Sequence, residues 1–459
     1  MTKSMLRLRW LVRRIGTLLA IFIKFAAFLP ILIFMVWFSY KVDISGLFQG
    51  ELAPRQVANL LLEGQSVSHY EQMDERQVLK VYAQNLTPEQ TPDTLAIGSS
   101  RVLQLNQGLA GSDSFFNAGV SGAGLMDVMN IFYLFDRADR LPKTLIFEVD
   151  PWLFNGVSYD DLNNRADKEL FQEFLQLGLG IDSGYEAESQ LESWKALLDP
   201  AYFQGNVQHY LSKKSEESSD DGSQSDELFR SLNNQDISQL SYSVKQSDGS
   251  IYYPLDFRSW DSEQVLAEAL RQAGTMESMH GFSAMDEKCT QLFQQFVSYV
   301  QSRGVKVIFL LSPYHPFILK HLANNPDGFE GFFAVEPWLR QYAQEQGIPV
   351  YGSYHASRVG IPESLFFDGI HCKDEALRLM FPGVEAALAG EQTAYQIEYA
   401  ATYGESHPEL TLEATVGTTG DCVVIDPEWF AAASEKTGYG TPYAAGFEEE
   451  SIPADNLAA

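Results

Sequence analysis

Cysteine and basic residues are scarce in this chain of 459 residues, and both shortages limit what it can do. The three cysteines, Cys289, Cys372 and Cys422, form no C-x-x-C pair, which excludes a disulfide framework and a cysteine-based metal or redox motif. Against 61 aspartates and glutamates stand only 32 lysines and arginines, a net charge of −29. Because such an acidic chain repels polyanions, we expect no nucleic-acid partner.

Two common nucleotide and hydrolase motifs are also missing. The chain's glycine-rich stretch reads Asn117-Ala-Gly-Val-Ser-Gly122-Ala-Gly124, which fits neither G-x-G-x-x-G nor G-x-S-x-G. We therefore expect no dinucleotide and no nucleophile elbow, and we predict no cofactor and no metal. Hydrophobic residues nevertheless make up 45% of the chain, enough for a large folded core.

The N-terminal region has the pattern of a membrane anchor. Residues 15–40 are almost wholly apolar, and a hydrocarbon core of ~30 Å needs about 20 helical residues. Basic residues and no acids occupy the first 14 positions, so residues 1–14 are predicted to stay in the cytoplasm. Residues 15–40 are predicted to cross the inner (cytoplasmic) membrane, and everything after Tyr40 to lie outside it, in the periplasm. A cleaved signal peptide is the competing interpretation, but residues 38–41 offer no small-x-small cleavage site.

Short apolar runs alternate with amphipathic stretches through the middle of the chain. The runs are 94–98, 114–120, 144–149, 306–312 and 348–352, and helical stretches include 124–137, 287–303 and 335–346. This alternation predicts a three-layer α/β/α fold around a parallel five-stranded sheet. In such folds the chemistry lies at the carboxyl ends of the strands.

The remaining segments suggest a division of the chain. Residues 41–92 are predicted to form a juxtamembrane stalk with helices near 56–62 and 71–84, and residues 93–390 the α/β domain. About 150 residues separate the third and fourth apolar runs, so a structured insertion is expected at about 156–285. The tail 391–459 carries 13 acids and a single base, and we expect little structure there.

Three polar residues follow predicted strands where a nucleophilic site would need them. The first strand ends in Gly98-Ser99-Ser100, and Asp368-Gly-Ile-His371 follows the last strand. An imidazole held by a carboxylate can take a proton from a serine hydroxyl. The plainer alternatives are that the serines cap a helix and that D-x-x-H is an ordinary surface loop.

Together these motifs resemble the SGNH (GDSL-type) hydrolase superfamily over residues 93–390, most of the insertion excluded. The resemblance implies a flavodoxin-like sheet, with Ser100 as nucleophile and oxyanion donor, Gly122 as the second oxyanion donor, and Asp368 and His371 completing the catalytic set. The family's third block, G-x-N-D, is not matched.

In place of that block stands Glu148-Val-Asp150-Pro-Trp152. Either Asn155 or the backbone N–H groups of Ser100 and Gly122 replace the family's asparagine as oxyanion donors, or the oxyanion is held more weakly. Further candidate substrate contacts beside these strand ends are Arg101, Asn117, Asp150, Trp152, Asn155, Tyr314 and His315. For Arg101, a local ion pair is the favoured alternative to binding an anionic substrate.

The layout is most similar to the membrane-anchored members that carry G-S-S, such as the proteins of alginate O-acetylation and teichoic acid D-alanylation. It implies a membrane-anchored O-acyltransferase or esterase that modifies cell-envelope polysaccharide, working beside a membrane-bound O-acyltransferase. Residues 15–40 would contact membrane lipid. The alternative is a non-catalytic accessory or glycan-binding protein that keeps the scaffold.

Overall fold

The computed structural model describes residues 14, 29–42, 52–68, 74–185, 197–200, 203–207, 210–211, 237–273, 279–324, 329–359 and 361–391. Residues 15–28 of the predicted anchor and the tail from residue 392 lie outside this part of the chain. The structure divides into two compact units, Met1–Arg55 with Glu186–Asp226 and Gln56–Tyr185 with Glu227–Ala459. The insertion therefore contributes to both units.

The first unit contains the described part of the predicted anchor. Residues 29–42 are helical, and the rings of Phe34 and Phe38 meet Phe203 edge-on. Several of its large apolar side chains are exposed, Trp37 among them. No helix among the described residues is both long enough and apolar enough to cross a bilayer.

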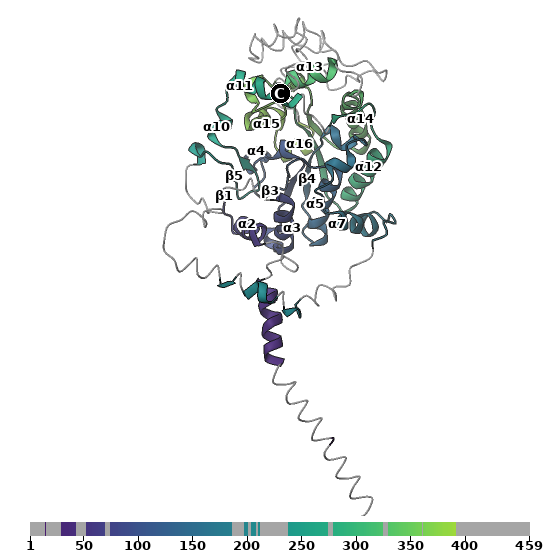
Figure 1. Ribbon diagram of the computed structural model, residues 1–459. Helices are drawn as coiled ribbons and strands as arrows, with labels where there is room; N and C mark the ends of the chain where they lie inside the picture. Colours follow the sequence, from purple (N-terminus) through teal and green to yellow (C-terminus); the bar gives the residue numbers. More distant parts are fainter. Residues whose placement is uncertain are drawn as a thin grey trace, which may run out of the picture. The chain divides into compact units, whose positions relative to one another are not determined.

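A parallel five-stranded sheet forms the centre of the second unit, as the sequence predicted (Figure 1). Its strands are β2 (Thr94–Ile97), β3 (Phe115–Asn117), β4 (Thr144–Glu148), β7 (Lys306–Leu311) and β8 (Val350–Gly352). They lie in the order β3-β2-β4-β7-β8, and all four neighbouring pairs are parallel. This is the flavodoxin-like order, whose direction reverses between β2 and β4.

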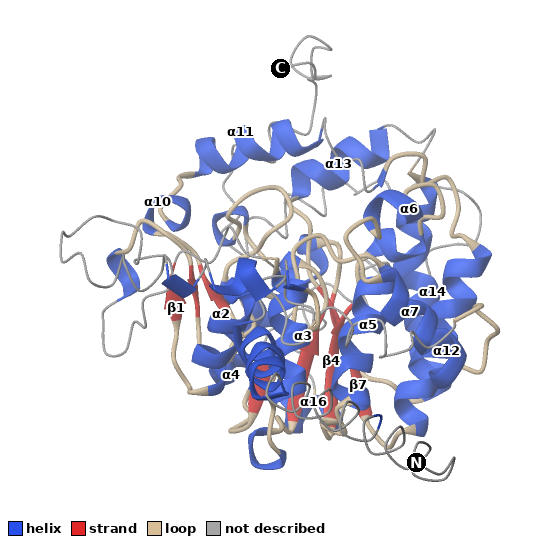
Figure 2. Cartoon of the chain, turned by 60° about the horizontal axis from the view of Figure 1, so that its bottom comes forward, coloured by secondary structure: helices blue, strands red, loops and turns tan. Residues whose placement is uncertain are grey.

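The apolar runs are buried on both sides of the sheet, which is why they do not alternate with polar residues. Leu95, Ile97 and Phe147 face one apolar core, whereas Ala96 and Ile146 face a second. The first core includes residues of α2 (Leu52–Leu62), α3 (Glu75–Asn85), α5 (Leu125–Arg137), α7 (Lys168–Glu173), α12 (Glu287–Ser302) and α14 (Glu330–Gln346). Figure 2 shows α5, α7, α12 and α14 on one side of the red strands.

The second core is covered by a different set of helices. They include α4 (Gln107–Ala110), α11 (Ser262–Ala273), α15 (Asp374–Met380) and α16 (Val384–Leu388). The helix α11 also contacts α13 (Pro316–Asn324), and α6 (Tyr159–Leu162) and α10 (Leu255–Arg258) are single turns of the insertion. The three-layer α/β/α prediction is thus confirmed for this unit.

Two parts of the fold differ from the predicted division of the chain. Val57, Leu61, Val78 and Tyr82 of α2 and α3 are buried in the first core, so these helices belong to the domain and are not a separate stalk. A small antiparallel sheet, which the sequence did not predict, joins β1 (Val67–Ser68) to β5 (Val244–Lys245) and β6 (Ile251–Tyr252) of the insertion. The strands are too short for their periodicity to be visible in the sequence.

Candidate active site

The two serines that follow β2 have different environments: Ser99 caps a helical turn, and Ser100 is partly exposed. The hydroxyl oxygen of Ser99 accepts a hydrogen bond from the N–H of Arg101 at 3.2 Å and caps a single helical turn, Ser100–Val102. Ser99 is fully buried, whereas Ser100 is only partly buried. The capping interpretation therefore applies to Ser99 and leaves the hydroxyl of Ser100 available for chemistry.

Gly98 allows β2 to pass close enough to β4 for this arrangement. Its φ is +152°, and a Cβ there would lie 2.7 Å from the Cβ of Glu148. The Glu148 carboxyl in turn accepts a hydrogen bond from the N–H of Ser99 at 3.3 Å. The serines consequently follow the strand at the point where the sheet order reverses, where ligands bind in this class of fold.

Asp368 and His371 share a tight loop. The N–H of Phe367 donates to the carbonyl of His371, which closes the loop. One carboxylate oxygen of Asp368 accepts the backbone N–H groups of Ile370 and His371 at 2.8 and 2.7 Å. The other lies 2.8 Å from Nδ1 of the His371 ring. Asp368 therefore fixes both the loop and the ring that the loop carries.

His371 connects this loop to the first strand. Its Nε2 lies 2.8 Å from the hydroxyl oxygen of Ser100, across 271 positions of sequence. The His371 side chain is 17% exposed and that of Asp368 only 6%, so the carboxylate is shielded while the ring can be reached. Ser100, His371 and Asp368 thus lie in one hydrogen-bonded row, the arrangement that activates a serine.

The ionisation of Asp368 suits this arrangement. Burial alone would raise the pKa of its carboxyl, but the charge and hydrogen bond of His371, with the Ile370 N–H and Gln272, outweigh burial and lower the pKa to about 2. Asp368 is a carboxylate at neutral pH and can stabilise a positive charge on the ring. A neutral His371 with its proton on Nδ1 leaves Nε2 to accept the proton of Ser100.

The loop after β3 carries Gly122 and begins beside the end of β2. The N–H groups of Ala118 and Val120 donate to the carbonyls of Ala96 and Gly98, which continues the β2–β3 pairing toward this loop. Gly122 has a φ of +59°, a left-handed conformation that favours glycine. Among the described hydrogen bonds, none is donated by the backbone N–H of Ser100 or of Gly122.

Arg101 does not reach toward a substrate. Its guanidinium is buried, pairs with Asp150 at 2.7 Å, and lies 3.7 Å from the centroid of the Tyr314 ring. Its remaining N–H groups donate to the carbonyls of Ile370 at 3.0 Å, of Pro313 at 2.9 Å and of Ser312. The local ion pair is confirmed, and the predicted substrate contacts of Arg101 and Asp150 are wrong. Arg101 instead ties the serine turn to the loop that carries His371.

Three further candidates are occupied by backbone groups. The amide of Asn117 donates to the carbonyls of Val102 and Leu105, both at 2.8 Å. The indole N–H of Trp152 donates to the carbonyl of Ala123 at 2.9 Å. The amide of Asn155 donates to the Ser158 hydroxyl and to the carbonyl of His280, and its oxygen accepts the N–H of Val157. Asn155 therefore does not replace the missing oxyanion donor, and all three side chains are structural.

Tyr314 and His315 are also buried, 0% and 1% exposed. Burial lowers the pKa of His315 to about 3, so its ring is neutral, and its Nδ1 accepts the N–H of Phe317. The predicted substrate contacts at these two positions are wrong as well. Polar residue types at strand ends are visible in a sequence, but their partners are not.

The insertion supplies residues to the site that the sequence analysis did not identify. Tyr253 lies with its ring centroid 5.2 Å from Phe367 and 6.4 Å from His371. Gln272 of α11 accepts the N–H of Gly369 at 2.8 Å, and its hydrogen bond to Asp368 helps to lower the pKa of that carboxyl. No motif in the sequence marks either residue, because their role depends on where the insertion folds back.

Glu148 is a third residue of the site without a sequence signal. Burial and the nearby charge of Asp150 raise its pKa well above the usual value, although Arg101 opposes this. Glu148, Asp150 and Arg101 thus form one buried group of interacting side chains.

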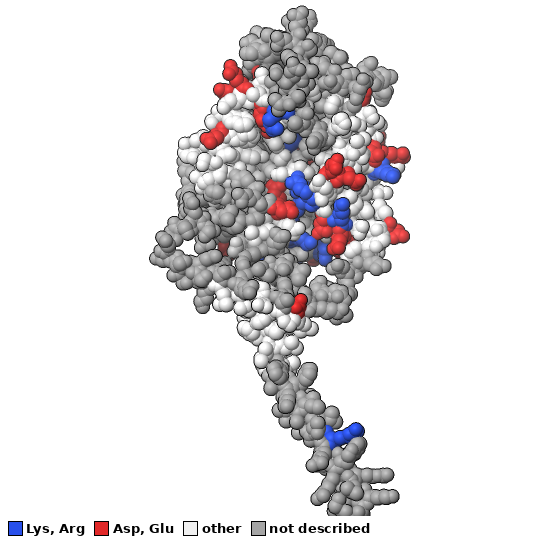
Figure 3. All heavy atoms as spheres, viewed as in Figure 1, with Lys and Arg blue, Asp and Glu red and all other residues white. Residues whose placement is uncertain are grey.

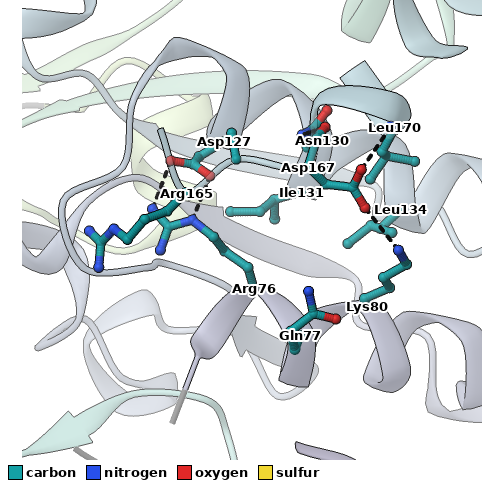
Figure 4. A pocket seen from close by; sticks show the side chains of 11 residues that line it. Arg76, Gln77, Lys80, Asp127, Asn130, Ile131, Leu134, Arg165, Asp167 and Leu170 are labelled. Atoms are coloured by element: carbon teal, nitrogen blue, oxygen red, sulfur yellow. Dashed lines mark hydrogen bonds and ion pairs between the residues drawn. The ribbon is translucent and has the colours of Figure 1, made fainter. Parts of the chain in front are cut away.

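Behind the Gly122 loop lies a polar cavity of about 190 Å³. Its lining includes Arg76, Lys80, Arg165, Asp127 and Asp167, and Figure 4 shows Arg76 facing Asp127 and Lys80 facing Asp167. On the surface, basic side chains also lie among acidic ones (Figure 3). The described residues thus show cations paired with acids on α3, α5 and the 163–167 loop.

Cys289 and Cys372 are both free and buried, so they do not pair; Cys422 lies outside the described residues. Within the described ranges, no group of His, Cys, Asp and Glu side chains could hold a metal ion.

No protein-family model matches the chain. A search of curated proteins finds no significant match either.

Proposed function

We propose that this protein is a serine acyl-transfer enzyme of the SGNH type that works through an acyl-serine intermediate. The observation that carries the proposal is the row from the Ser100 hydroxyl through His371 to Asp368, with a spacing of 2.8 Å at both steps. The ring is partly open to a substrate, and the N–H groups of Ser100 and Gly122 are unengaged among the described hydrogen bonds.

The reaction proceeds in two halves. His371 Nε2 takes the proton of Ser100 as its oxygen attacks an ester or thioester carbonyl, and the N–H groups of Ser100 and Gly122 donate to the resulting oxyanion. The intermediate collapses, the C–O or C–S bond breaks, and His371 returns the proton to the leaving group. A second hydroxyl then attacks the acyl-serine, with His371 again as base and then acid, and frees Ser100.

The acceptor hydroxyl decides between an esterase, which uses water, and an O-acyltransferase, which uses a sugar. Tyr253 and Gln272 of the insertion contact the loop of His371, and such contacts favour transfer where they exclude water. We propose cell-envelope polysaccharide as the acceptor, by similarity of layout to the membrane-anchored relatives. On the same basis, residues 15–40 anchor the chain in the cytoplasmic membrane, and a membrane-bound O-acyltransferase supplies the acyl group.

One observation favours a second candidate, a non-catalytic accessory protein that binds glycan. The Asn155 amide is fully engaged, so the described site offers only two backbone oxyanion donors. Loss of one oxyanion donor costs about 2.7–4 kcal/mol of transition-state stabilisation in serine enzymes. The loss of an oxyanion donor has no consequence for a protein that does not catalyse a reaction.

A fluorophosphonate probe separates the two candidates, because it phosphonylates an activated serine. We expect the full chain to be labelled and Ser100→Ala to lose the label. The matched control Ser283→Ala changes an exposed serine of the insertion and is expected to label like the wild type. A wild-type chain that remains unlabelled contradicts the enzymatic proposal and supports the accessory role.

A further inference from the structure

Charged side chains bind the two peptide groups that flank the Cα of Ser121, and two of them bind the peptide between Ser121 and Gly122. The carbonyl of Ser121 accepts hydrogen bonds from Nη2 of Arg165 at 2.6 Å and from Nη2 of Arg76 at 3.4 Å. The N–H of Ser121 donates to the carboxylate of Glu75. Two guanidinium groups thus converge on one carbonyl next to the proposed oxyanion donor.

Arg76 is itself fixed in place. Its Nε and Nη2 bond to the two carboxylate oxygens of Asp127 at 2.6 and 2.7 Å, and both side chains are buried. Asp127 also accepts the N–H of Gly124 at 3.0 Å, in the first turn of α5. Figure 4 shows Arg76 and Arg165 on the same side of the cavity, beside Asp127. Hydrogen bonds therefore hold the loop on both sides of Gly122, at Ser121 and at Gly124.

A trans peptide is planar, so its C=O and N–H point in opposite directions. Fixing the Ser121 carbonyl among the guanidinium groups therefore fixes the direction of the Gly122 N–H. Two cationic donors on the carbonyl also polarise the peptide, which strengthens the N–H as a donor. We propose that Arg165 and Arg76 are positioning residues that orient and polarise the oxyanion donor Gly122; this inference rests on the proposed function.

The conformation of Gly122 is consistent with a close approach of the Arg165 guanidinium. A Cβ at this position would lie 2.7 Å from Nη2 of Arg165, in addition to the strain of a φ of +59°. The guanidinium of Arg165 thus occupies the space that a side chain would take. With only two backbone donors at the site, the direction of each one weighs more on catalysis.

The test measures how fast a fluorophosphonate labels Ser100, because the phosphonyl oxygen uses the same two donors. Arg165 is exposed, so Arg165→Gln is expected to fold. The maximal labelling rate should fall about tenfold, with the probe's apparent affinity unchanged, less than the 10²- to 10³-fold loss that follows removal of a whole donor. Arg165→Lys keeps the positive charge but loses the planar N–H groups of the guanidinium. Its labelling rate should lie between those of the wild type and Arg165→Gln.

Lys168→Gln is the matched control, since it removes an equally exposed positive charge at the start of α7. It should label at the wild-type rate. Wild-type labelling rates in Arg165→Gln, or an equal loss in Lys168→Gln, would overturn the inference while leaving the proposed function intact. If Arg165→Gln fails to fold, Arg165→Lys provides the test, and a wild-type labelling rate in Arg165→Lys would overturn the inference. A wild-type chain that is not labelled refutes the proposed function and the inference with it.

Discussion

Exchange of Asp150 for asparagine tests the buried charge beneath Ser100. The Arg101 guanidinium is 0% exposed and Asp150 1% exposed, and the two are 2.7 Å apart. Removing one partner of a buried pair costs about 3–5 kcal/mol, because the other charge is left uncompensated. The carbonyls of Ile370 and Pro313 still accept from Arg101, so we expect a loss near the lower limit, about 3 kcal/mol of unfolding free energy.

The expected loss depends on pH through Glu148. Burial and the charge of Asp150 raise the pKa of Glu148 in the wild type. Without the charge of Asp150, the pKa of Glu148 falls, and a Glu148 carboxylate can then replace the missing partner of Arg101. Because a raised folded-state pKa makes stability fall as the pH rises above the unfolded value, the wild type should lose stability between pH 5 and pH 8. A lower Glu148 pKa in Asp150→Asn makes that loss smaller, so the stability difference between the two proteins should be larger near pH 5 than near pH 8.

Urea unfolding of the full chain, followed by tryptophan fluorescence at both pH values, measures this difference. Glu148→Gln is the matched control, because glutamine has nearly the shape of the protonated carboxyl and can still accept the N–H of Ser99. It should cost less than about 1 kcal/mol. If Glu148→Gln costs as much as Asp150→Asn, Glu148 carries the charge and the reasoning is wrong.

Three further predictions concern the same site. Asp368→Asn should slow fluorophosphonate labelling of Ser100 by about 10³-fold or more, since the His371 ring loses the carboxylate that sets its tautomer; labelling within tenfold of the wild type would contradict this role. Because the Asp368 pKa is lowered to about 2, its pairing should contribute about 2 kcal/mol of stability above pH ~4, lost as the pH falls toward 2; urea midpoints of the wild type and Asp368→Asn should therefore converge in acid. Gly98→Ala should cost about 2 kcal/mol or more in a thermal melt, since its Cβ would meet Glu148 at 2.7 Å, whereas Gly108→Ala, with 3.4 Å to its nearest neighbour, should be nearly neutral.

The central sheet was predictable because burial on both faces leaves a continuous apolar run in the sequence. The predicted run 144–149 corresponds to β4 (Thr144–Glu148), and 306–312 to β7 (Lys306–Leu311). The small sheet was not predictable, since β1, β5 and β6 have two residues each. Nor was the burial of α2 and α3, because an amphipathic helix shows that it has an apolar face but not what covers that face.

The sequence by itself determined the five apolar strands and the order in which Ser100, Gly122, Asp368 and His371 follow them. Parallel strands end at one edge, so these residues had to approach one another. Tertiary structure alone decided that Arg101 is buried against Asp150 and that Arg165 grips the Gly122 loop. The reason is physical: local hydrophobic periodicity is written along the chain, whereas the partner of a polar side chain depends on which distant segment folds against it.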